Sequence, residues 1–393
     1  MQRNFTFFMP TKIVFGPGRL EALATEKLPG KKALVVISAG KSMRQSGYLD
    51  RTLSALEKNG VSALVFDKIL PNPIEEHVHE GAALARKEHC DFVLGLGGGS
   101  SIDSAKSIAV MAKNPGRYWD YIHGGSGKGR PVTGGVLPIV AIPTTSGTGT
   151  EADPWTVITN MDAKEKIGFG TEETFPALSI VDPELTLTVP PKLTAYQGMD
   201  AFFHAAEGYL ANVSQPVSDH FALDSMRLIA GFLPRAVKNG GDREARTAVS
   251  WASCQAGLVE STSSCISQHS MEHALSAFHP DLPHGAGLIL LSVSYFTFFA
   301  KKAPARFPAM ARAMGQNVDA LPEIERPMAF VTALTELIAG IGLSDMKLTD
   351  FGVNKEEIPA LADNAMHAMG ALFTLDPYSL SREEVMTIFE GCF

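Results

Sequence analysis

The stretch that decides the fold is DFVLGLGGGSSIDSAKSIAVMAKN, residues 91–114. Its apolar start predicts a buried strand, and three glycines, 97–99, are followed at once by a helical pattern from Ile102. Such a turn places unpaired backbone N–H groups and a helix N-terminus where a phosphate fits. The stretch lacks the GxGxxG pattern and the lysine of a Walker loop. It predicts either a nucleotide-binding turn or an ordinary glycine-rich helix cap.

The surrounding sequence repeats this alternation of strand and helix patterns. Helical patterns cover residues 48–59 and 76–89. Further strand candidates are KKALVVIS (31–38), SALVFD (62–67), LPIVAIPT (137–144), WTVITN (155–160) and ALSIVD (177–182). The alternation predicts βαβ units and a parallel, Rossmann-like sheet.

After about residue 182 the alternation stops. The remaining sequence predicts one helix after another, for example over 216–233, 242–259 and 327–340. Prolines at 183, 190 and 191 mark the change. We therefore expect an α/β domain over residues 1–183 and an all-helical domain over residues 184–393.

The helical half carries a carboxylate and several histidines at helical spacing. Asp200 and His204 are four residues apart, as are His269 and His273, and His284 follows shortly after. Positions i and i+4 lie on one face of a helix, so each pair can grip one divalent metal ion. Any single histidine is commonly an ordinary core or surface residue, and that alternative stays open for each. Their shared register favours a metal site.

A second polar loop, PTTSGTGTEADPW at residues 143–155, directly follows an apolar strand pattern. Hydroxyl groups at this density, at the carboxyl end of a strand, suit hydrogen bonds to ribose and phosphate oxygens. A merely polar loop is the alternative.

Composition narrows the class of partner. The chain has 393 residues, 45% of them hydrophobic, and a net charge of -8 with scattered lysines and arginines. This excludes the basic footprint of a nucleic-acid or anionic-membrane binder, so small molecules are the expected partners. There is no apolar run of membrane-spanning length and no signal peptide, so we expect a cytoplasmic protein. Four cysteines without CxxC spacing indicate a reducing compartment, and we interpret Cys265 as a buried thiol.

Several motifs, in order along nearly the whole chain, together resemble the iron-dependent (group III) alcohol dehydrogenase family. They are FGPG (15–18), PNP (71–73), GGGSSID (97–103), PTTSGTGTE (143–151), VDPELT (181–186), GMDAFFHAAEGY (198–209) and HSMEHALSAFHPDLPHG (269–285). The resemblance implies a dehydroquinate synthase-like architecture, in which residues 1–183 form a dinucleotide-binding α/β domain, residues 184–393 form an all-helical metal-binding domain, and the metal lies in the cleft between them. It also implies a homodimer or higher homo-oligomer.

The resemblance implies roles for individual residues. The implied metal ligands are Asp200, His204, His269 and His284. His273 would lie beside the nicotinamide, as a proton-handling or cofactor-positioning residue. Implied contacts to the cofactor are Gly97, Gly98, Gly99 and Ser100 at the pyrophosphate, Thr144, Thr145, Thr148 and Thr150 along the phosphates and nicotinamide, Asp103 and Lys166 nearby, and Asn72 on the adenosine side.

These residues support a concrete reaction. A metal held by one carboxylate and three neutral imidazoles keeps an open position, where it stabilises the alkoxide of an alcohol while hydride passes to nicotinamide C4. In reverse it polarises an aldehyde. The ligand set suits several divalent ions, and the family favours Fe(II), then Zn(II).

The choice of nicotinamide cofactor depends on the end of the strand ALVVIS. NAD-preferring members of the family have an Asp where this chain has Ser38, and the residues that follow, up to Lys41, offer no carboxylate to repel a 2′-phosphate. NADP is therefore favoured over NAD. Lys41 either pairs with that phosphate or is a solvated surface lysine.

Two departures from the family and two alternative functions stay open. The gap from His273 to His284 is one residue longer than in many members, and we expect ligation to survive this. Glu260 replaces a bulky aromatic; it either favours polar substrates or is a surface charge.

The alternative functions are a lyase or cyclase of the dehydroquinate synthase type, which accumulates no reduced cofactor, and a non-catalytic assembly protein.

Overall fold

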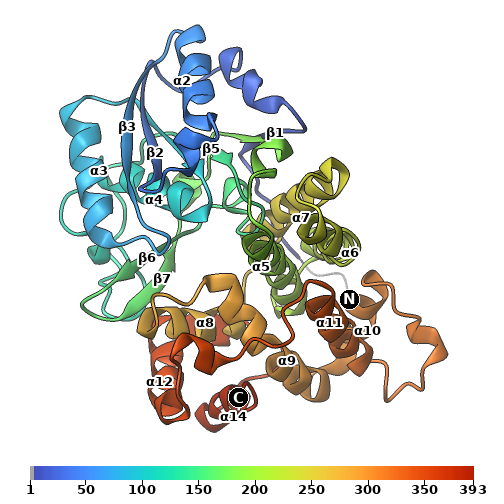
Figure 1. The fold of residues 1–393 in the computed structure, drawn as a ribbon. Helices are drawn as coiled ribbons and strands as arrows, with labels where there is room; N and C mark the ends of the chain where they lie inside the picture. The colour runs from blue at the N-terminus through green and yellow to red at the C-terminus, as the bar shows by residue number, and fades with distance from the viewer. Residues whose placement is uncertain (1–3) are drawn as a thin grey trace. The chain divides into compact units, whose positions relative to one another are not determined.

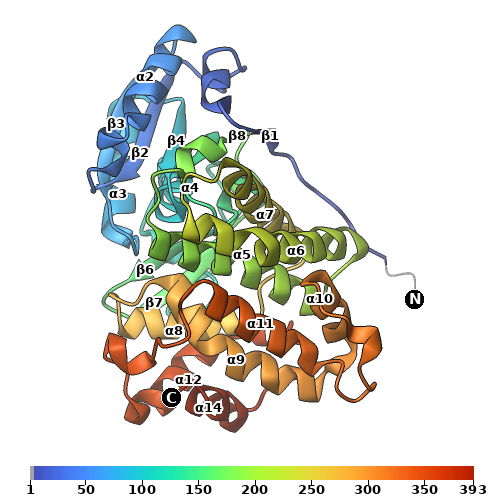
Figure 2. The ribbon, with the colours of Figure 1, turned by 45° about the vertical axis from the view of Figure 1, so that its right-hand side comes forward.

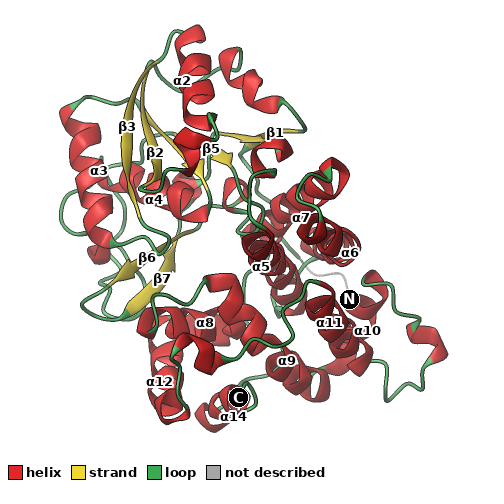
Figure 3. Cartoon of the chain, in the orientation of Figure 1, coloured by secondary structure: helices red, strands yellow, loops and turns green. Residues whose placement is uncertain are grey.

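The computed structural model describes residues 4–393 and divides into two compact units. One is an α/β unit, Met9–Val189, and the other is a helical unit, Pro190–Phe393, which also includes residues 4–8. In the described part of the chain, all strands belong to the α/β unit (Figure 3). The predicted fold class is thus confirmed. The units divide after Val189, whereas the sequence prediction placed the boundary after residue 183.

A six-stranded parallel sheet forms the centre of the α/β unit (Figure 1). In spatial order its strands are β1 (Lys12–Phe15), β8 (Leu178–Val181), β5 (Ile139–Pro143), β4 (Phe92–Gly97), β2 (Lys32–Ser38) and β3 (Ser62–Ile69). Successive strands of a parallel sheet need crossover connections, and α2 (Tyr48–Lys58), α3 (Glu75–Lys87) and α4 (Gly99–Met111) supply three of them. At one edge Gly97 of β4 pairs with Pro143 of β5, so the loops after these two strands start side by side.

Each face of the sheet packs against its own layer. Alternate residues such as Val35 and Leu94 join the apolar cluster that includes Leu49 and Leu56 of α2. On the other face Gly95 leaves so little room that a Cβ atom there would lie 2.8 Å from Ile102 Cα in α4. Helix α4 therefore packs directly on β4, and its N-terminus is fixed just beyond the end of that strand.

A two-stranded antiparallel sheet lies apart from the parallel one in hydrogen bonding. WTVITN does contain a strand, β6 (Thr156–Asn160), but its partner is β7 (Glu165–Phe169), which the sequence pattern did not predict. Strand β1, at the edge of the parallel sheet, was not predicted either.

The helical unit contains the predicted succession of helices (Figure 2). The longer ones are α5 (Pro191–Leu210), α6 (Pro216–Lys238), α7 (Arg243–Thr262), α8 (Ser267–Phe278), α9 (His284–Lys302), α11 (Met328–Gly340) and α12 (Ile358–Ala368). Shorter ones are α10 (Phe307–Ala313), α13 (Gly370–Phe373) and α14 (Arg382–Glu390). Among the described residues no single helix is long and apolar enough to cross a membrane. The segment of α9 and the segment that ends with α10, bent by 101° relative to each other, reach that length and apolar composition only when taken together.

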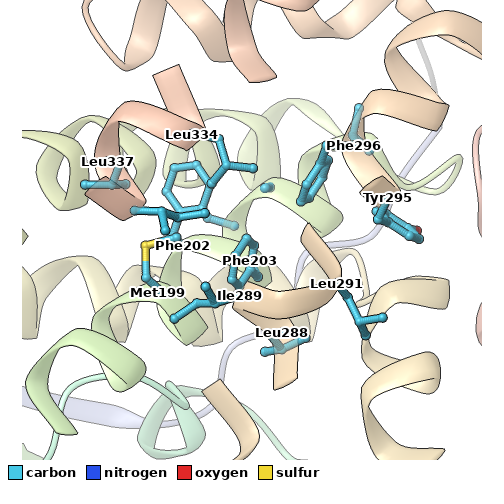
Figure 4. Close-up of a cluster of buried hydrophobic side chains, with 14 of the residues drawn as sticks. Met199, Phe202, Phe203, Leu288, Ile289, Leu291, Tyr295, Phe296, Leu334 and Leu337 are labelled. Atoms are coloured by element: carbon cyan, nitrogen blue, oxygen red, sulfur yellow. The ribbon is translucent and has the colours of Figure 1, made fainter. Parts of the chain in front are cut away.

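Helix α5 has an apolar face and a polar face. Met199, Phe202 and Phe203 point into a cluster with residues of α9 and α11, among them Phe296 and Leu334 (Figure 4). The Phe202 and Phe203 rings meet edge to face at 5.6 Å. Because this face is held in the core, the other face of α5 presents its polar side chains in fixed positions.

Candidate active site

Three helices bring together the carboxylate and histidines singled out in the sequence. Helix α5 supplies Asp200 and His204, α8 supplies His269 and His273, and α9 begins with His284. The Oδ1 atom of Asp200 lies 3.4 Å from Nδ1 of His204, 3.8 Å from Nε2 of His269 and 3.5 Å from Nε2 of His284. The longer loop before His284 therefore leaves its ring within reach of Asp200.

Two atoms of this cluster are buried without a hydrogen bond. They are Oδ1 of Asp200 and Nε2 of His269, both without a hydrogen-bond partner among the described residues. Buried polar atoms are normally paired, because leaving them unpaired costs free energy. A cation that accepts their lone pairs removes this cost. Atoms of Asp200, His269 and His284 lie within 4.8 Å of one another, so the donor set fits a divalent metal ion such as Fe(II) or Zn(II).

His204 lies at the side of this group. Its ring centroid is 4.4 Å from that of His269. Its Nδ1 atom is 3.0 Å from the carbonyl oxygen of Asp200, and its Nε2 atom is 3.5 Å from Oε2 of Glu260 in α7. Glu260, which the sequence left between pocket and surface, is therefore directed at the histidine cluster.

Cys265 is buried, as the sequence interpretation expected. It lies two residues before the start of α8, and its sulfur atom and ring nitrogens of His204 and His269 lie within 4.8 Å of one another. Burial raises the pKa of the Cys265 thiol well above its usual value, so the thiol keeps its proton.

The ionisation states of the cluster differ from those of free side chains. Burial acts to raise the pKa of Asp200, but the surrounding imidazoles outweigh it and lower that pKa to about 2. Burial lowers the pKa of His204 to about 4. For His269 burial also acts to lower the pKa, but the negative charge of Glu207 and the contact with Asp200 act against it, and the pKa is raised well above the usual value. A metal ion therefore competes with a proton for His269.

His273, one turn after His269, lies next to the predicted ligands. Its ring centroid is 5.4 Å from that of His284 and 6.3 Å from that of His269. Its Nδ1 atom is 2.8 Å from the sulfur of Met369. The other ring nitrogen, Nε2, is thus the one that can exchange a proton with a ligand of the site.

The two loops predicted to hold the cofactor are in contact within the α/β unit. A Cβ atom on Gly98 would lie 3.1 Å from Oγ1 of Thr145, and one on Gly99 would lie 2.5 Å from Cγ2 of Thr148. The amide of Thr144 donates to the carbonyl oxygen of Gly97 at 2.8 Å. The small size of Gly98 and Gly99 thus allows the two loops to approach closely and form a cradle at the start of α4, where the first N–H groups of a helix lack partners within it. Such a cradle fits the pyrophosphate of a dinucleotide.

The buried side chains of Asp103 and Lys106 contact the threonine loop of this cradle. Asp103 accepts hydrogen bonds from Thr150 Oγ1 at 2.7 Å and from the amide of Val157 at 3.0 Å. Burial raises the pKa of Asp103, and the positive charges of Lys106 and Lys166 act against that rise. Lys106 is fully buried and donates to Thr150 Oγ1 at 2.7 Å. Asp103 thus contacts the threonine loop through Thr150.

The remaining predicted cofactor residues lie at the ends of other strands. Ser100 donates to the carbonyl oxygen of Pro71, which places the glycine turn beside the segment that carries Asn72. Ser38 is the last residue of β2, and Lys41 is exposed just before α1 (Ser42–Gln45).

Comparison with known proteins assigns the chain. Residues 10–183 match the family model "Iron-containing alcohol dehydrogenase", and residues 194–393 match "Fe-containing alcohol dehydrogenase family, C-terminal". The chain belongs to the iron-containing alcohol dehydrogenase family.

Individual relatives of this iron-containing alcohol dehydrogenase match its sequence over all or most of its length. It is 34% identical to 1,3-propanediol dehydrogenase of Citrobacter freundii, over 100% of this chain and 99% of the relative. It is 36% identical to the NAD-dependent methanol dehydrogenase of Bacillus methanolicus, over 91% and 92% of the two chains. The crystal structure of an archaeal halo-thermophilic alcohol dehydrogenase from a Red Sea brine pool superposes with a TM-score of 0.94 at 34% identity, covering 100% of both chains.

The reaction class predicted from the sequence is therefore confirmed. The protein is an alcohol oxidoreductase of the iron-containing, nicotinamide-dependent kind, acting on small-molecule alcohols. These matches give no support to the lyase alternative.

Sequence reasoning missed the carboxylates that lie behind the histidines. Glu207 and Glu272 are fully buried, and each contacts a ring nitrogen of a predicted ligand. Their positions contain a usable signal: Glu207 is three residues after His204 and Glu272 three after His269, so each is on the same helix face as a ligand.

Proposed function

We propose that this iron-containing alcohol dehydrogenase holds one divalent metal ion, Fe(II) in preference to Zn(II), on four residues: Asp200, His204, His269 and His284. The observation that carries the proposal is the buried Oδ1 atom of Asp200, which has no hydrogen bond and is surrounded by imidazole nitrogens at 3.4 Å, 3.5 Å and 3.8 Å. The metal preference comes from the family, because the ligand types themselves suit both ions.

A metal ion held by these residues would polarise the oxygen of an alcohol or aldehyde, and a bound nicotinamide would exchange a hydride with the carbon. Asp200 keeps its negative charge at neutral pH because its pKa is about 2. His204 stays neutral there because its pKa is about 4, so its ring keeps a lone pair. We assign to Nε2 of His273 the transfer of the hydroxyl proton, since its Nδ1 faces Met369.

We also propose that the cradle binds the pyrophosphate of the cofactor. Gly97, Gly98, Gly99 and Ser100 would contact it through backbone N–H groups, and Thr144, Thr145, Thr148 and Thr150 would line it with hydroxyls. Asp103 and Lys166 would act through the threonine loop, and Asn72 would lie on the adenosine side. The contact between the two loops supports this proposal.

The proposed preference for NADP rests on Ser38 and Lys41. Neither offers a negative charge, and the exposed Lys41 can pair with a 2′-phosphate. The name of the Bacillus methanolicus relative points the other way, because that enzyme is NAD-dependent. Comparing kcat/KM with the two cofactors tests the proposal, and a preference of about tenfold for NAD would refute it.

The substrate pocket carries a distinctive charge in Glu260. Its carboxylate lies 3.5 Å from His204 Nε2 and its side chain is 16% exposed, which supports the pocket interpretation over the surface one. We propose that Glu260 favours polar or hydroxylated alcohols. Replacing Glu260 by Phe should shift the preference toward apolar alcohols, and an unchanged substrate profile would remove Glu260 from the pocket.

One experiment tests the function as a whole. The protein is purified without oxygen, stripped of metal, reloaded with Fe(II) or Zn(II), and assayed with a panel of alcohols and aldehydes and both cofactors. We expect metal-dependent net formation or consumption of reduced nicotinamide. Metal-dependent conversion without any net change in the cofactor would instead indicate a lyase. Light scattering of the same preparation tests the expected homodimer or larger assembly.

A further inference from the structure

In His269 and His284, the ring nitrogen that faces away from Asp200 contacts a buried glutamate. Nδ1 of His269 is 2.5 Å from Oε1 of Glu207, and Nδ1 of His284 is in close contact with Oε2 of Glu272. We propose that Glu207 and Glu272 are positioning residues of the metal centre, which hold the two histidines as ligands and strengthen metal binding. This inference rests on the proposed function and deepens it.

Glu207 joins α5 to the start of α8. Besides the ring of His269, its Oε2 atom accepts hydrogen bonds from the amides of Ile266 at 2.8 Å and His269 at 3.3 Å. Glu207 is fully buried, so water does not compete for these contacts. One carboxylate therefore fixes the backbone and the ring of His269 together.

Glu272 joins α8 to the start of α9. It is fully buried, and its Oε1 atom accepts a hydrogen bond from Ser276 one turn later. A Cβ atom on Gly287 would lie 2.8 Å from the Cγ and Oε1 atoms of Glu272, so the glycine makes room for the carboxylate beside His284. The space around Glu272 is thus fitted to this side chain.

These contacts select the ring form that can bind a metal. An imidazole that donates Nδ1–H to a carboxylate keeps its lone pair on Nε2, and the carboxylate makes that nitrogen a stronger donor. In both His269 and His284 it is Nε2 that faces Asp200 Oδ1, at 3.8 Å and 3.5 Å. The orientation required of a metal ligand is therefore the one that the two glutamates impose.

The other histidines of the cluster provide a contrast. Nδ1 of His273, which is not among the proposed ligands, faces the sulfur of Met369, a weak acceptor. Nδ1 of His204 contacts Asp200 itself, at 3.0 Å from the carbonyl oxygen and 3.4 Å from Oδ1, so its partner is another proposed ligand. Fully buried glutamates thus contact Nδ1 of His269 and of His284, and the negative charge of these two carboxylates lies behind the rings. A divalent cation bound in front offsets this charge.

The test measures metal binding rather than turnover. Metal-free protein is titrated with Co(II) or Zn(II) against a chromophoric chelator, and the visible spectrum of the Co(II) form is recorded. Glu207→Gln and Glu272→Gln keep an oxygen acceptor but lose the charge. We expect each to weaken metal binding by about 10–100-fold and to change the Co(II) spectrum. Glu272→Ala, which loses the acceptor as well, should bind more weakly than Glu272→Gln.

Asp376→Asn is the matched control. Asp376 is also buried and also holds the start of α8, because its Oδ1 atom accepts from the amide and hydroxyl of Ser267 at 3.1 Å and 2.9 Å. Because these contacts are to Ser267 and not to the ring of a proposed ligand, Asp376→Asn should leave metal affinity and the Co(II) spectrum unchanged.

Three results would overturn the inference. Glutamine variants that bind metal within about twofold of the unsubstituted protein would show that the carboxylates do not act on the ligands. Equal weakening by Asp376→Asn would show a general packing effect. If the unsubstituted protein binds no metal, the proposed function fails together with this inference. Should Glu272→Ala fail to fold, the glutamine variants decide.

Discussion

The proposed metal cluster and the proposed cofactor cradle are built by opposite means. The cluster consists of side-chain atoms, carboxylate oxygens and ring nitrogens, brought by three helices to within 4.8 Å of one another. The cradle consists of backbone, and its essential feature is the absence of side chains at Gly98 and Gly99. One site should therefore be lost when a side chain is removed, and the other when a side chain is added.

The two regions also differ in how they are supported. Behind the histidines lie buried carboxylates that contact the ligands themselves. Below the cradle lies a buried lysine that contacts the threonine loop instead. Replacing a supporting carboxylate in the helical unit should therefore change metal affinity. Replacing the supporting lysine in the α/β unit should instead change stability.

The largest effect is expected from removing a metal ligand. His269→Ala deletes a nitrogen that faces Asp200 and should lower kcat/KM by at least about 10³-fold, because metal electrostatics supply several kcal/mol. Metal content should fall in parallel. The control is His220→Ala, an exposed position on α6. Retention of both metal and activity in His269→Ala would exclude it as a ligand.

The second effect concerns the stability of the α/β unit. Lys106 donates to Asp153 Oδ1 at 3.0 Å and to the carbonyls of Asp153 and Trp155 at 2.9 Å and 2.6 Å, in addition to Thr150. Lys106→Met leaves these acceptors unpaired and should lower the free energy of unfolding by about 3–5 kcal/mol. Urea denaturation measures it. Lys128→Met, whose ion pair with Asp120 is exposed, should cost at most about 1 kcal/mol, and equal losses would contradict the account.

The third effect is specific to the cradle. Gly99→Ala places a Cβ atom 2.5 Å from Cγ2 of Thr148, and relieving this contact should cost about 1–3 kcal/mol of cofactor binding, roughly tenfold to a hundredfold in Kd. Fluorescence titration with the reduced cofactor measures it. Gly231→Ala in α6, where a Cβ atom would meet nothing within 4 Å, is the control. Unchanged cofactor binding in Gly99→Ala would place the pyrophosphate elsewhere.

The smallest effect is a change in the pH dependence of stability, caused by Asp376 at the start of α8. Burial raises the pKa of Asp376 to about 8, whereas an unfolded Asp titrates near about 3.9. The folded state thus holds an extra proton between these values, so this group's contribution to stability is complete below about pH 4 and is lost as pH rises through about 8.

Asp376→Asn mimics the protonated acid and should remove this dependence. Its free energy of unfolding should be within about 1 kcal/mol of the original protein near pH 4, and the variant should become progressively more stable than the original as pH rises toward about 9. Denaturation curves at both pH values, with metal in excess, measure it. Parallel profiles for the two proteins would mean that Asp376 is ionised throughout.

Much of the fold followed from local patterns in the sequence. The buried strands β2, β4 and β5 are continuous apolar runs, and the helices carry clear periodicity, so both were predictable. Strand β1 was missed because it has four residues and is defined by pairing with β8, far along the chain. Strand β7 was missed for the same reason: EKIGF becomes a strand only against β6.

The candidate site was predictable where helix spacing carries the signal. The i and i+4 positions of Asp200 and His204 are on one helix, so their proximity needed no tertiary information. The roles of Glu207 and Glu272 depend on contacts between helices, which spacing alone does not give. Asp103 was expected near the cofactor, and only the fold places Thr150 and Val157 against its carboxylate.

The most direct test of the metal centre is a crystal structure of the protein grown with Fe(II) or Zn(II), with anomalous scattering recorded at the metal edge. The account predicts one strong peak about 2.0–2.2 Å from Asp200 Oδ1 and from Nε2 of His269 and His284, with His204 completing the set. A metal peak remote from Asp200, or a fully loaded and active enzyme without one there, would contradict it.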